Sequence, residues 1–282
     1  MSSAAVVGLG AIAGFTIFLG LPLGRVRKVS VPLRATLNAL AAGILLFLLW
    51  EVLSHSAEPV EDSLVAAAID HTGSWARFVG LAAVFTVCLT VGLLSLVYYD
   101  QWVARAVARR HGPGAMSVAE RPARGVLGIA DEARRLSLLI AVGIGLHNLA
   151  EGLAIGQSAA AGEISLAVLL VIGFGLHNAT EGFGIVAPLT GADERPSWGF
   201  LGLLGLIGGG PTFLGTVIGQ SFVNDTVYLG FLALAAGSIL YVVVQLLRVG
   251  FKLGHLRALY WGLLGGLLLG IATDFFLVAV GG

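Results

Sequence analysis

The chain has 282 residues, of which 57% are hydrophobic and 11% charged, and its mean hydropathy is +0.94. Soluble domains are nearer a quarter charged, so this composition excludes a single water-soluble core and predicts an all-α protein of the lipid bilayer. The formal net charge is zero, which gives no reason to expect nucleic acid as a partner, and the single cysteine, Cys88, excludes an intrachain disulfide and a cysteine-based metal cluster.

Apolar runs of about 20 residues predict eight membrane-spanning helices. In chain order they cover 4–23, 35–54, 76–99, 136–157, 164–187, 198–220, 227–247 and 258–280. The whole chain, 1–282, is therefore predicted to be one integral membrane domain. Its longest connection, 100–135, is predicted to be a flexible cytoplasmic loop because it contains proline, glycine and many arginines.

The basic residues fall almost entirely on one side of these predicted spans. Fifteen of the 16 Lys and Arg lie around the first, third, fifth and seventh connections, and only Arg77 lies on the other side. Basic connections stay in the cytoplasm, so both termini are predicted to face outward. The opposite side carries acids, which form either an ordinary solvated face or a vestibule that attracts cations: Glu58, Glu61, Asp62, Asp70, Glu163 and Asp225.

A motif of His, Asn and Glu occurs twice, thirty residues apart, within the predicted fourth and fifth spans. The first copy contains His147, Asn148 and Glu151, and the second contains His177, Asn178 and Glu181. Four-residue spacing places His and Glu of each copy on one helix face, and the short link between the spans makes them antiparallel neighbours. Both copies lie near the middle of a roughly 30 Å hydrocarbon core, where an ionisable side chain costs roughly 3 kcal/mol. Two copies at one depth therefore indicate a site rather than helix packing.

Two imidazoles and two carboxylates that face each other suit Zn²⁺, and less specifically Fe²⁺, Mn²⁺, Co²⁺ or Cd²⁺. The predicted metal ligands are His147, Glu151, His177 and Glu181. Asn148 and Asn178 either offer carbonyl oxygens beside this site or hydrogen-bond the carboxylates. A divalent cation or two protons would neutralise the paired carboxylates, so metal binding and protonation could be coupled there.

Other polar residues and one helix irregularity lie outside the motif. Glu51, at the end of the predicted second span, and His55, one turn further, form either an entrance site for cations or an interfacial capping pair. Asp274, in the last span, is a further candidate entrance acid. The run that ends in Gly210 and Pro211 predicts a kink in the sixth span, because proline removes a helix hydrogen bond and glycine loosens the backbone. This kink either belongs to the paired site or serves packing alone.

On these residues the chain resembles the ZIP family of zinc and iron transporters (Zrt-/Irt-like proteins), and especially its GufA-like bacterial branch. Members have eight spans, both termini outside, and a motif of the form H-N-x-x-[DE]-G in the fourth span with a related pattern in the fifth. The resemblance implies that spans 1–3 and 6–8 are inverted repeats around the 4–5 pair. It further implies a homodimer in the cell (inner or plasma) membrane, with no prosthetic group, that moves divalent metal into the cytosol.

The resemblance also assigns residues. It implies that His147, Glu151, His177 and Glu181 form the primary metal site, with Asn148 and Asn178 at a neighbouring second site. Members often have a Glu immediately before the proline of the sixth span, and here Gly210 stands in that place. This departure predicts a weakened second site and one bound metal ion.

Three hypotheses of function follow. The first is a divalent-metal transporter that works by alternating access, in which the 4–5 unit carries the metal past a scaffold. The second is an intramembrane metalloenzyme, which is disfavoured because the sequence has no H-E-x-x-H motif and no separate acid, base or substrate pocket. We therefore expect the chain not to be an enzyme. The third is a passive cation channel, which would need the same ligands.

Overall fold

The computed structural model describes residues 3–26, 30–110, 132–160, 162, 164–190, 194–221 and 224–280, which form helices and turns and contain no strand. Within these residues, eight long helices follow one another: α1 (Ser3–Phe15), α2 (Val31–Ala68), α3 (Trp75–Arg110), α4 (Glu132–Ala160), α5 (Ile164–Val186), α6 (Trp198–Gly219), α7 (Asp225–Lys252) and α8 (Leu256–Val280). Three 3₁₀ segments extend α1 and α5: η1 (Thr16–Leu19), η2 (Leu21–Arg25) and η3 (Ala187–Leu189).

Seven helical segments of the described chain are long and apolar enough to cross a membrane. They are Ser3–Arg25, Val31–Ala68, Trp75–Tyr99, Ala133–Ala160, Trp198–Gly219, Asp225–Lys252 and Leu256–Phe275. The prediction of a helical, multi-pass membrane protein is thereby confirmed. The remaining long helix, α5, packs against α1, α2 and α4 of this set.

Several helices begin where the sequence supplies a capping side chain. Ser30 accepts a hydrogen bond from the Leu33 backbone N–H at the start of α2, and Ser197 caps α6 in the same way. Asn224 accepts from the Val227 N–H at the start of α7. Each cap satisfies one of the backbone donors that a helix start leaves open.

Two boundaries differ from the predicted spans. Helix α2 continues past residue 54 to Ala68, so its 38 residues reach roughly 57 Å at 1.5 Å per residue. Helix α3 continues to Arg110 and α4 begins at Glu132, so both ends of the predicted loop 100–135 are helical, and residues 111–131 between them lie outside the described residues. Apolar length indicates only the part of a helix that fits in hydrocarbon, and both helices continue in polar sequence beyond it.

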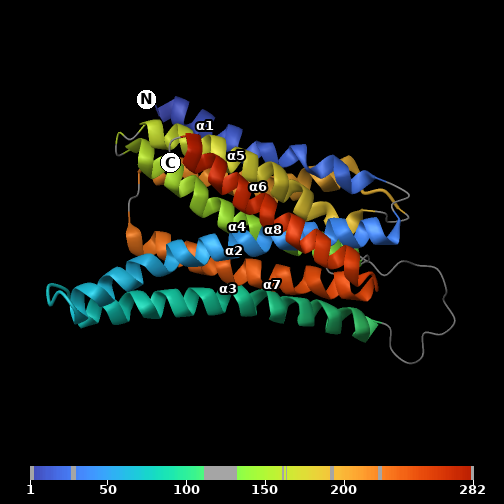
Figure 1. The fold of residues 1–282 in the computed structure, drawn as a ribbon, viewed down its shortest axis with the longest axis horizontal. Helices are drawn as coiled ribbons and strands as arrows, with labels where there is room; N and C mark the ends of the chain where they lie inside the picture. Colours follow the sequence, from blue (N-terminus) through green and yellow to red (C-terminus); the bar gives the residue numbers. More distant parts are fainter. Residues whose placement is uncertain are drawn as a thin grey trace.

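The helix contacts divide the molecule into two groups (Figure 1). The first group contains α1, α4, α5 and α6, with α4 packed most heavily on α6 and α1 packed on both α5 and α6. The second group contains α2, α3, α7 and α8, in which α2 packs on α8 and α7, and α3 packs on α7. The groups meet mainly where α4 contacts α7 and where α2 contacts α5. The predicted 4–5 pair therefore does not stand apart, because α1 and α6 join it.

Glycines bring α2 very close to α8. A Cβ added at Gly43 of α2 would collide with the backbone carbonyl oxygen of Leu263 on α8. From the other side, a Cβ added at Gly266 of α8 would collide with the carbonyl oxygen of Leu40 on α2. Only glycine permits this approach, which lets membrane helices pack backbone against backbone.

The interface between α7 and α3 repeats these contacts. A Cβ at Gly237 of α7 would collide with the Leu89 carbonyl oxygen on α3, and a Cβ at Gly92 of α3 would collide with the Leu234 carbonyl oxygen on α7. Gly237 and Leu234 of α7 lie 194 residues after Gly43 and Leu40 of α2, which make the corresponding contacts. Gly266 and Leu263 of α8 likewise lie 174 residues after Gly92 and Leu89 of α3. One packing arrangement is thus built twice, from helices far apart in sequence.

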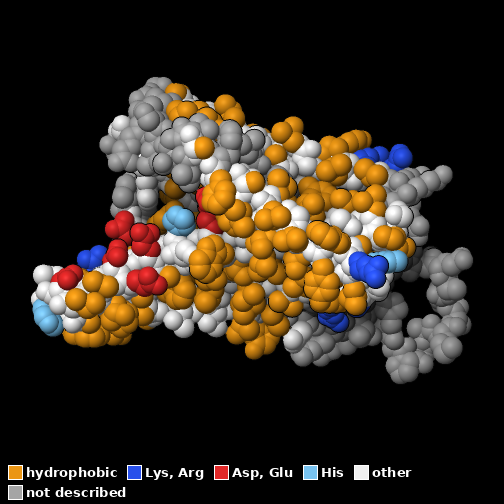
Figure 2. Space-filling view, in the orientation of Figure 1, with side chains coloured by type: hydrophobic (Ala, Val, Ile, Leu, Met, Phe, Trp, Pro, Cys, Tyr) orange, Lys and Arg blue, Asp and Glu red, His pale blue; other side chains and the backbone are white. Residues whose placement is uncertain are grey.

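Charged side chains gather at opposite ends of the helices (Figure 2). We call the end where Glu58, Asp62 and Asp225 line one cavity the acidic end, and the end where Arg248 and Lys252 lie together the basic end. At the basic end, Arg25 of η2 donates a hydrogen bond to the Pro196 carbonyl oxygen, and its guanidinium carbon lies 4.5 Å from the centre of the Trp198 ring. Arg25 thereby ties the end of the first helical segment to the start of α6.

Candidate functional site

The first copy of the motif lies in the interior of α4. The Nε2 atom of His147 is 3.1 Å from the Oε1 atom of Glu151, and the two residues are 4% and 5% exposed. This pairing follows directly from their four-residue spacing, which places both side chains on one face of the helix.

Glu181 of α5 brings the second copy to the first. Its side chain is buried, and its carboxyl group interacts electrostatically with the carboxyl of Glu151 and the imidazole of His147. The two helices contact each other directly, as the short link between them predicted. The structure therefore gathers His147, Glu151 and Glu181 in one buried region.

The two asparagines anchor α4 and α5 to their neighbours. The Asn148 side-chain amide donates to the Gly208 carbonyl oxygen of α6 at 3.0 Å, and the Asn178 amide donates to the Ala13 carbonyl oxygen of α1 at 2.9 Å. The Asn148 amide also lies beside the Glu181 carboxyl. Each asparagine thus ties its own helix to a neighbouring helix of the first group. Its amide NH₂ makes this contact, and its amide oxygen takes no part in it.

Helix α4 contacts α6 in the same way as α5 contacts α1 and η1. A Cβ at Gly152 of α4 would collide with the Thr212 carbonyl oxygen of α6, and a Cβ at Gly182 of α5 would collide with the Ile17 carbonyl oxygen of η1. Thr212 lies 195 residues after Ile17, which is also the separation of Gly208 from Ala13. The pairs α4–α6 and α5–α1 therefore hold the two motif copies in matching environments.

Three buried oxygen atoms of this region accept no hydrogen bond within the described structure: Glu151 Oε2, Asn148 Oδ1 and Asn178 Oδ1. A buried acceptor without a partner costs roughly 1–3 kcal/mol. A cation would satisfy several such oxygens at once, so the donor set fits a cationic ligand. Their chemistry, carboxylate and amide oxygen beside an imidazole, is that of divalent metal sites.

The described side chains alone do not form a closed metal site. No three His, Cys, Asp or Glu side chains in the part of the chain that the structure describes converge closely enough to hold a metal ion. His177 belongs to α5, and its side chain lies outside the described residues. The set of four ligands therefore stays a prediction.

Glu51 reaches the site from the second group. This half-buried residue lies in the middle of α2, and its carboxyl interacts electrostatically with His147, His55 and Asp274. The alternative of a capping pair is wrong, because α2 continues to Ala68 and Glu51 is not at a helix end. The His55 Nδ1 atom lies 2.9 Å from the Glu51 carbonyl oxygen, one turn earlier on the same helix. All three predicted entrance residues are thus near one another.

Tyr228 of α7 was not predicted from the sequence. It interacts electrostatically with Glu151 and Glu51, so it too belongs to the region of the site. It follows the helix cap Asn224 by four residues, and a tyrosine there looks like an ordinary aromatic residue at a membrane interface. Nothing in the sequence around Tyr228 distinguishes it from such a tyrosine.

The predicted kink falls in a helix that the structure shows without interruption. Helix α6 runs through Gly210 and Pro211, whereas α1 changes from α to 3₁₀ geometry at Thr16. Gly210 shares a face with Leu206 and Leu214, which are 57% and 54% exposed, and a Cβ at Gly210 would meet no atom within 4 Å. A side chain at position 210 would point away from the buried site. The prediction that Gly210 weakens a second metal site stays a prediction.

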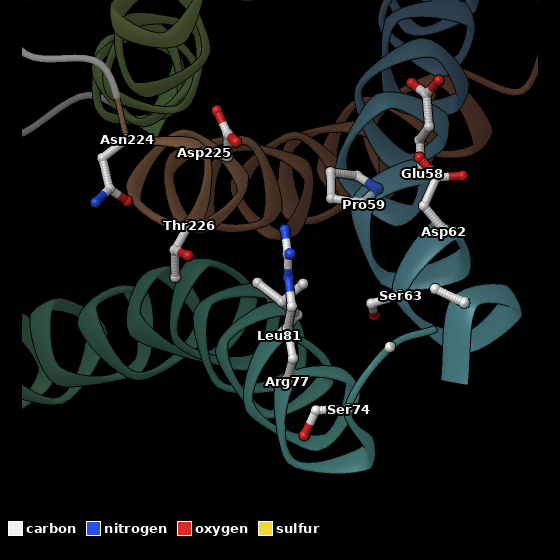
Figure 3. A pocket seen from close by; sticks show the side chains of 12 residues that line it. Glu58, Pro59, Asp62, Ser63, Ser74, Arg77, Leu81, Asn224, Asp225 and Thr226 are labelled. Atoms are coloured by element: carbon white, nitrogen blue, oxygen red, sulfur yellow. The ribbon is translucent and has the colours of Figure 1, made fainter. Parts of the chain in front are cut away.

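A cavity of about 710 Å³ opens at the acidic end between α2, α3 and α7. Its walls include the carboxylates of Glu58, Asp62 and Asp225, and Figure 3 shows Arg77 reaching from α3 into the space between the other two helices. Glu58 lies seven residues after Glu51, which is two turns along the same face of α2. The cavity and the buried site thus share one side of this helix.

Comparison of the sequence with models of protein families and with curated proteins finds no match in either case. The side chains of the buried region are therefore the basis for a functional conclusion.

Proposed function

We propose that the chain is a transporter of divalent metal ions, with zinc the best-suited substrate, and that it moves metal into the cytosol through a site formed by His147, Glu151, His177 and Glu181. The observation that supports this most is the burial, inside an apolar helix bundle, of acceptor oxygens without hydrogen-bond partners beside a His–Glu pair. Such groups inside a membrane protein mark ion pathways, because their burial is otherwise costly. Asn148 and Asn178 contribute amide oxygens or orient the ligands.

The proposed topology has eight spans, with α5 as the eighth, and both termini outside. The excess of Lys and Arg at the basic end supports a cytosolic location for that end. The acidic end, with its carboxylate-lined cavity, would then attract cations from outside toward Glu51 and Asp274. The repeated glycine contacts of α2 with α8 and of α7 with α3 support inverted repeats of α1–α3 and α6–α8.

Alternating access would use the two helix groups. Most of the site belongs to α4 and α5 in the first group, whereas Glu51 and Tyr228 face it from the second group. Relative movement of the groups would expose the site first to one side and then to the other. The moving unit in this proposal contains α1 and α6 as well as α4 and α5, since Asn148 and Asn178 tie them together. The resemblance to ZIP transporters supports the same function, and with it a homodimer in the cell membrane.

The test is uptake of Zn²⁺ into liposomes that contain the full chain and an internal metal-sensitive dye. The double substitution His177→Ala with Glu181→Ala should reduce uptake to the rate of protein-free liposomes. Tyr260→Phe, on the exposed face of α8, is the control and should leave uptake unchanged. Unchanged uptake in the double variant would show that the site assignment is wrong.

A second measurement separates a carrier from a channel. For a carrier the rate should saturate with external Zn²⁺ and fall steeply on cooling, because each ion requires a movement of the helix groups. Flux that rises in proportion to concentration and persists in the cold would favour the channel.

A further inference from the structure

An apolar cavity of about 790 Å³ lies between the two helix groups. One wall is α3 of the second group, and the other is formed by α4 and α6 of the first group. Each helix contributes residues that recur after three or four positions and so form one stripe along it. The lining includes Ser95 and Tyr99 of α3, Leu138 and Val142 of α4, and Leu203 and Ile207 of α6.

The surface of this cavity does not suit water. Of the described residues that line it, only Ser95 and Tyr99 carry a polar side-chain group. The Ser95 hydroxyl already donates a hydrogen bond to the Gly92 carbonyl oxygen of its own helix at 3.4 Å. Cavities lined by apolar side chains stay dry and accept apolar molecules, because water needs several polar partners. An occupant of this cavity must therefore be apolar.

Close backbone contacts hold both walls in place. A Cβ added at Gly145 of α4 would collide with the Ile207 carbonyl oxygen of α6, and a Cβ added at Gly92 of α3 would collide with the Leu234 carbonyl oxygen of α7. Within the described residues α3 packs mainly on α7 and α2, and makes no comparable contact with α4 or α6. Side chains beside an unfilled space lose their dispersion contacts on that side. The surroundings must therefore fill the space that the protein leaves open.

Aromatic residues mark the depth at which the cavity begins. The Trp102 ring centre lies 6.2 Å from that of Tyr99, and Tyr98 and Trp102 are 65% and 54% exposed. Exposed Trp and Tyr gather at the level of lipid headgroups. Along α6 the lining extends from Phe200 to Ile207, which is roughly 10 Å at 1.5 Å per residue. This depth falls within the roughly 15 Å of hydrocarbon in one leaflet.

The cavity continues into an exposed apolar surface on both sides. Leu94 of α3 precedes the lining residue Ser95, and Leu206 of α6 precedes the lining residue Ile207. These two leucines and the lining residue Leu203 are exposed. At this depth of a bilayer, lipid acyl chains are the medium that contacts such side chains. An acyl chain that covers these leucines can thus enter the cavity beside them.

We propose that this cavity between α3, α4 and α6 binds one acyl chain of a membrane phospholipid from the leaflet at the basic end, with the lipid headgroup at the level of Tyr98 and Trp102. Because the walls come from both helix groups, relative movement of the groups changes the shape of the cavity. A fluid acyl chain can follow this change, whereas a rigid ring cannot. The binding stands on the cavity alone, whereas the effect on transport rests on the proposed function.

The binding test uses the full chain in nanodiscs of phosphatidylcholine that contain a phosphatidylcholine with a photoreactive diazirine in one acyl chain. After illumination, mass spectrometry of peptides should find the label on Leu96 and Leu139, which line the cavity and are 7% and 4% exposed. Val142→Phe fills part of the cavity and should lower this labelling severalfold. Val87→Phe, the same change at an exposed position of α3 outside the cavity, should leave it unchanged.

A second variant separates filling of the cavity from misfolding. Ser95→Phe places a ring in the cavity from the α3 wall and should lower the labelling as Val142→Phe does from the α4 wall. Both variants should unfold in detergent at about the temperature of wild type, since neither removes an apolar contact. Absence of label on Leu96 and Leu139 in wild type, or labelling that neither filling variant reduces, would overturn the proposal.

The other possible occupant is a second copy of the chain. Leu203→Cys places a thiol at the exposed edge of the cavity, where mild oxidation would link two copies that meet there. We expect no more linked dimer than wild type gives, whose Cys88 sets the background. Efficient linkage that requires Leu203→Cys would show that protein covers the cavity and would overturn the lipid assignment.

The effect on transport is tested by Zn²⁺ uptake into phosphatidylcholine liposomes. Val142→Phe should transport severalfold more slowly than wild type, and Val87→Phe should transport at the wild-type rate. Reduced labelling without any change in uptake would overturn the role in transport and leave the binding site. Absence of uptake by wild type would instead contradict the proposed transport function, while the labelling still reports on the cavity.

Discussion

Helices α2 and α7 occupy matching places in the second group, yet the faces that they turn toward the first group differ in chemistry. Their contacts with α8 and α3 repeat residue by residue, down to the carbonyl oxygens that approach Gly43 and Gly237. In contrast, Glu51, which reaches the buried site, is matched by Gln245. Packing is thus duplicated between the halves while charge is not. The difference teaches that the fold is symmetric where helices must fit together and asymmetric in the charge of the faces that α2 and α7 turn toward the first group.

The largest effect is expected at the repeated His-Asn-Glu motif, where Glu151 of α4 can be compared with Glu181 of α5. Glu151→Gln and Glu181→Gln, tested separately, should each lower Zn²⁺ uptake at least about tenfold, because each removes a predicted ligand charge. Equal losses would show that the two copies serve one site. Normal uptake by either variant in liposomes would show that the symmetry of the motif is not functional.

The repeated interfaces predict equal losses of stability. Gly43→Ala and Gly237→Ala each place a Cβ against a backbone carbonyl that cannot move alone, so each should destabilise the protein by roughly 1–3 kcal/mol. Thermal unfolding in detergent measures this. Gly265→Ala is the control, since its Cβ would meet no atom within 4 Å. A large loss of stability at the α2–α8 interface and none at the α7–α3 interface, or the reverse, would show that the two interfaces are not equivalent.

The charge difference predicts a smaller, one-sided effect. Glu51→Gln should raise the half-saturating Zn²⁺ concentration roughly fivefold, about 1 kcal/mol of affinity, because a carboxylate that interacts electrostatically with His147 is lost. Gln245→Ala at the matching position should leave this concentration unchanged. Uptake kinetics at several metal concentrations provide the measurement, and equal effects of the two substitutions would contradict the asymmetry.

The smallest effect concerns Tyr228, which faces the site from α7. Tyr228→Phe removes only the hydroxyl group near Glu151 and Glu51, and should change metal affinity about two- to threefold, as expected for one hydrogen-bonding group. Tyr260→Phe, on the exposed face of α8, is the matched control. If the two variants behave alike, Tyr228 has no part in the site.

The sequence predicts what depends on local spacing. Four-residue spacing pairs His147 with Glu151, and the short link between the fourth and fifth spans brings Glu181 to them. The positions of most spans follow from apolar length in the same way. These properties involve residues of one helix or of adjacent helices, so the pattern contains the necessary information.

The sequence does not predict what depends on distant contacts. That α1 and α6 join α4 and α5 follows from hydrogen bonds such as that of Asn178 to Ala13, which are 165 residues apart. The direction of Gly210 depends on which face of α6 packs inward, and the glycine run around it gives no periodic pattern that would identify that face. The predicted second span is shorter than α2 because residues 55–68 include charged and polar side chains yet are helical, and apolar length indicates only the part of a helix that fits in hydrocarbon.

The crossed pairing of the two halves has a consequence for how the chain assembles during synthesis. Helix α3 finds its main partner in α7, and α2 finds one of its main partners in α8, which leaves the ribosome after the other seven helices described here. Gly43 and Gly92 must therefore wait, with their bare backbone faces unpaired, until more than half of the protein has followed them into the membrane. A chain that stops after Lys252 would complete the α3–α7 contact and leave Gly43 exposed to lipid. The interface between α2 and α8 forms only after α8 has been synthesised.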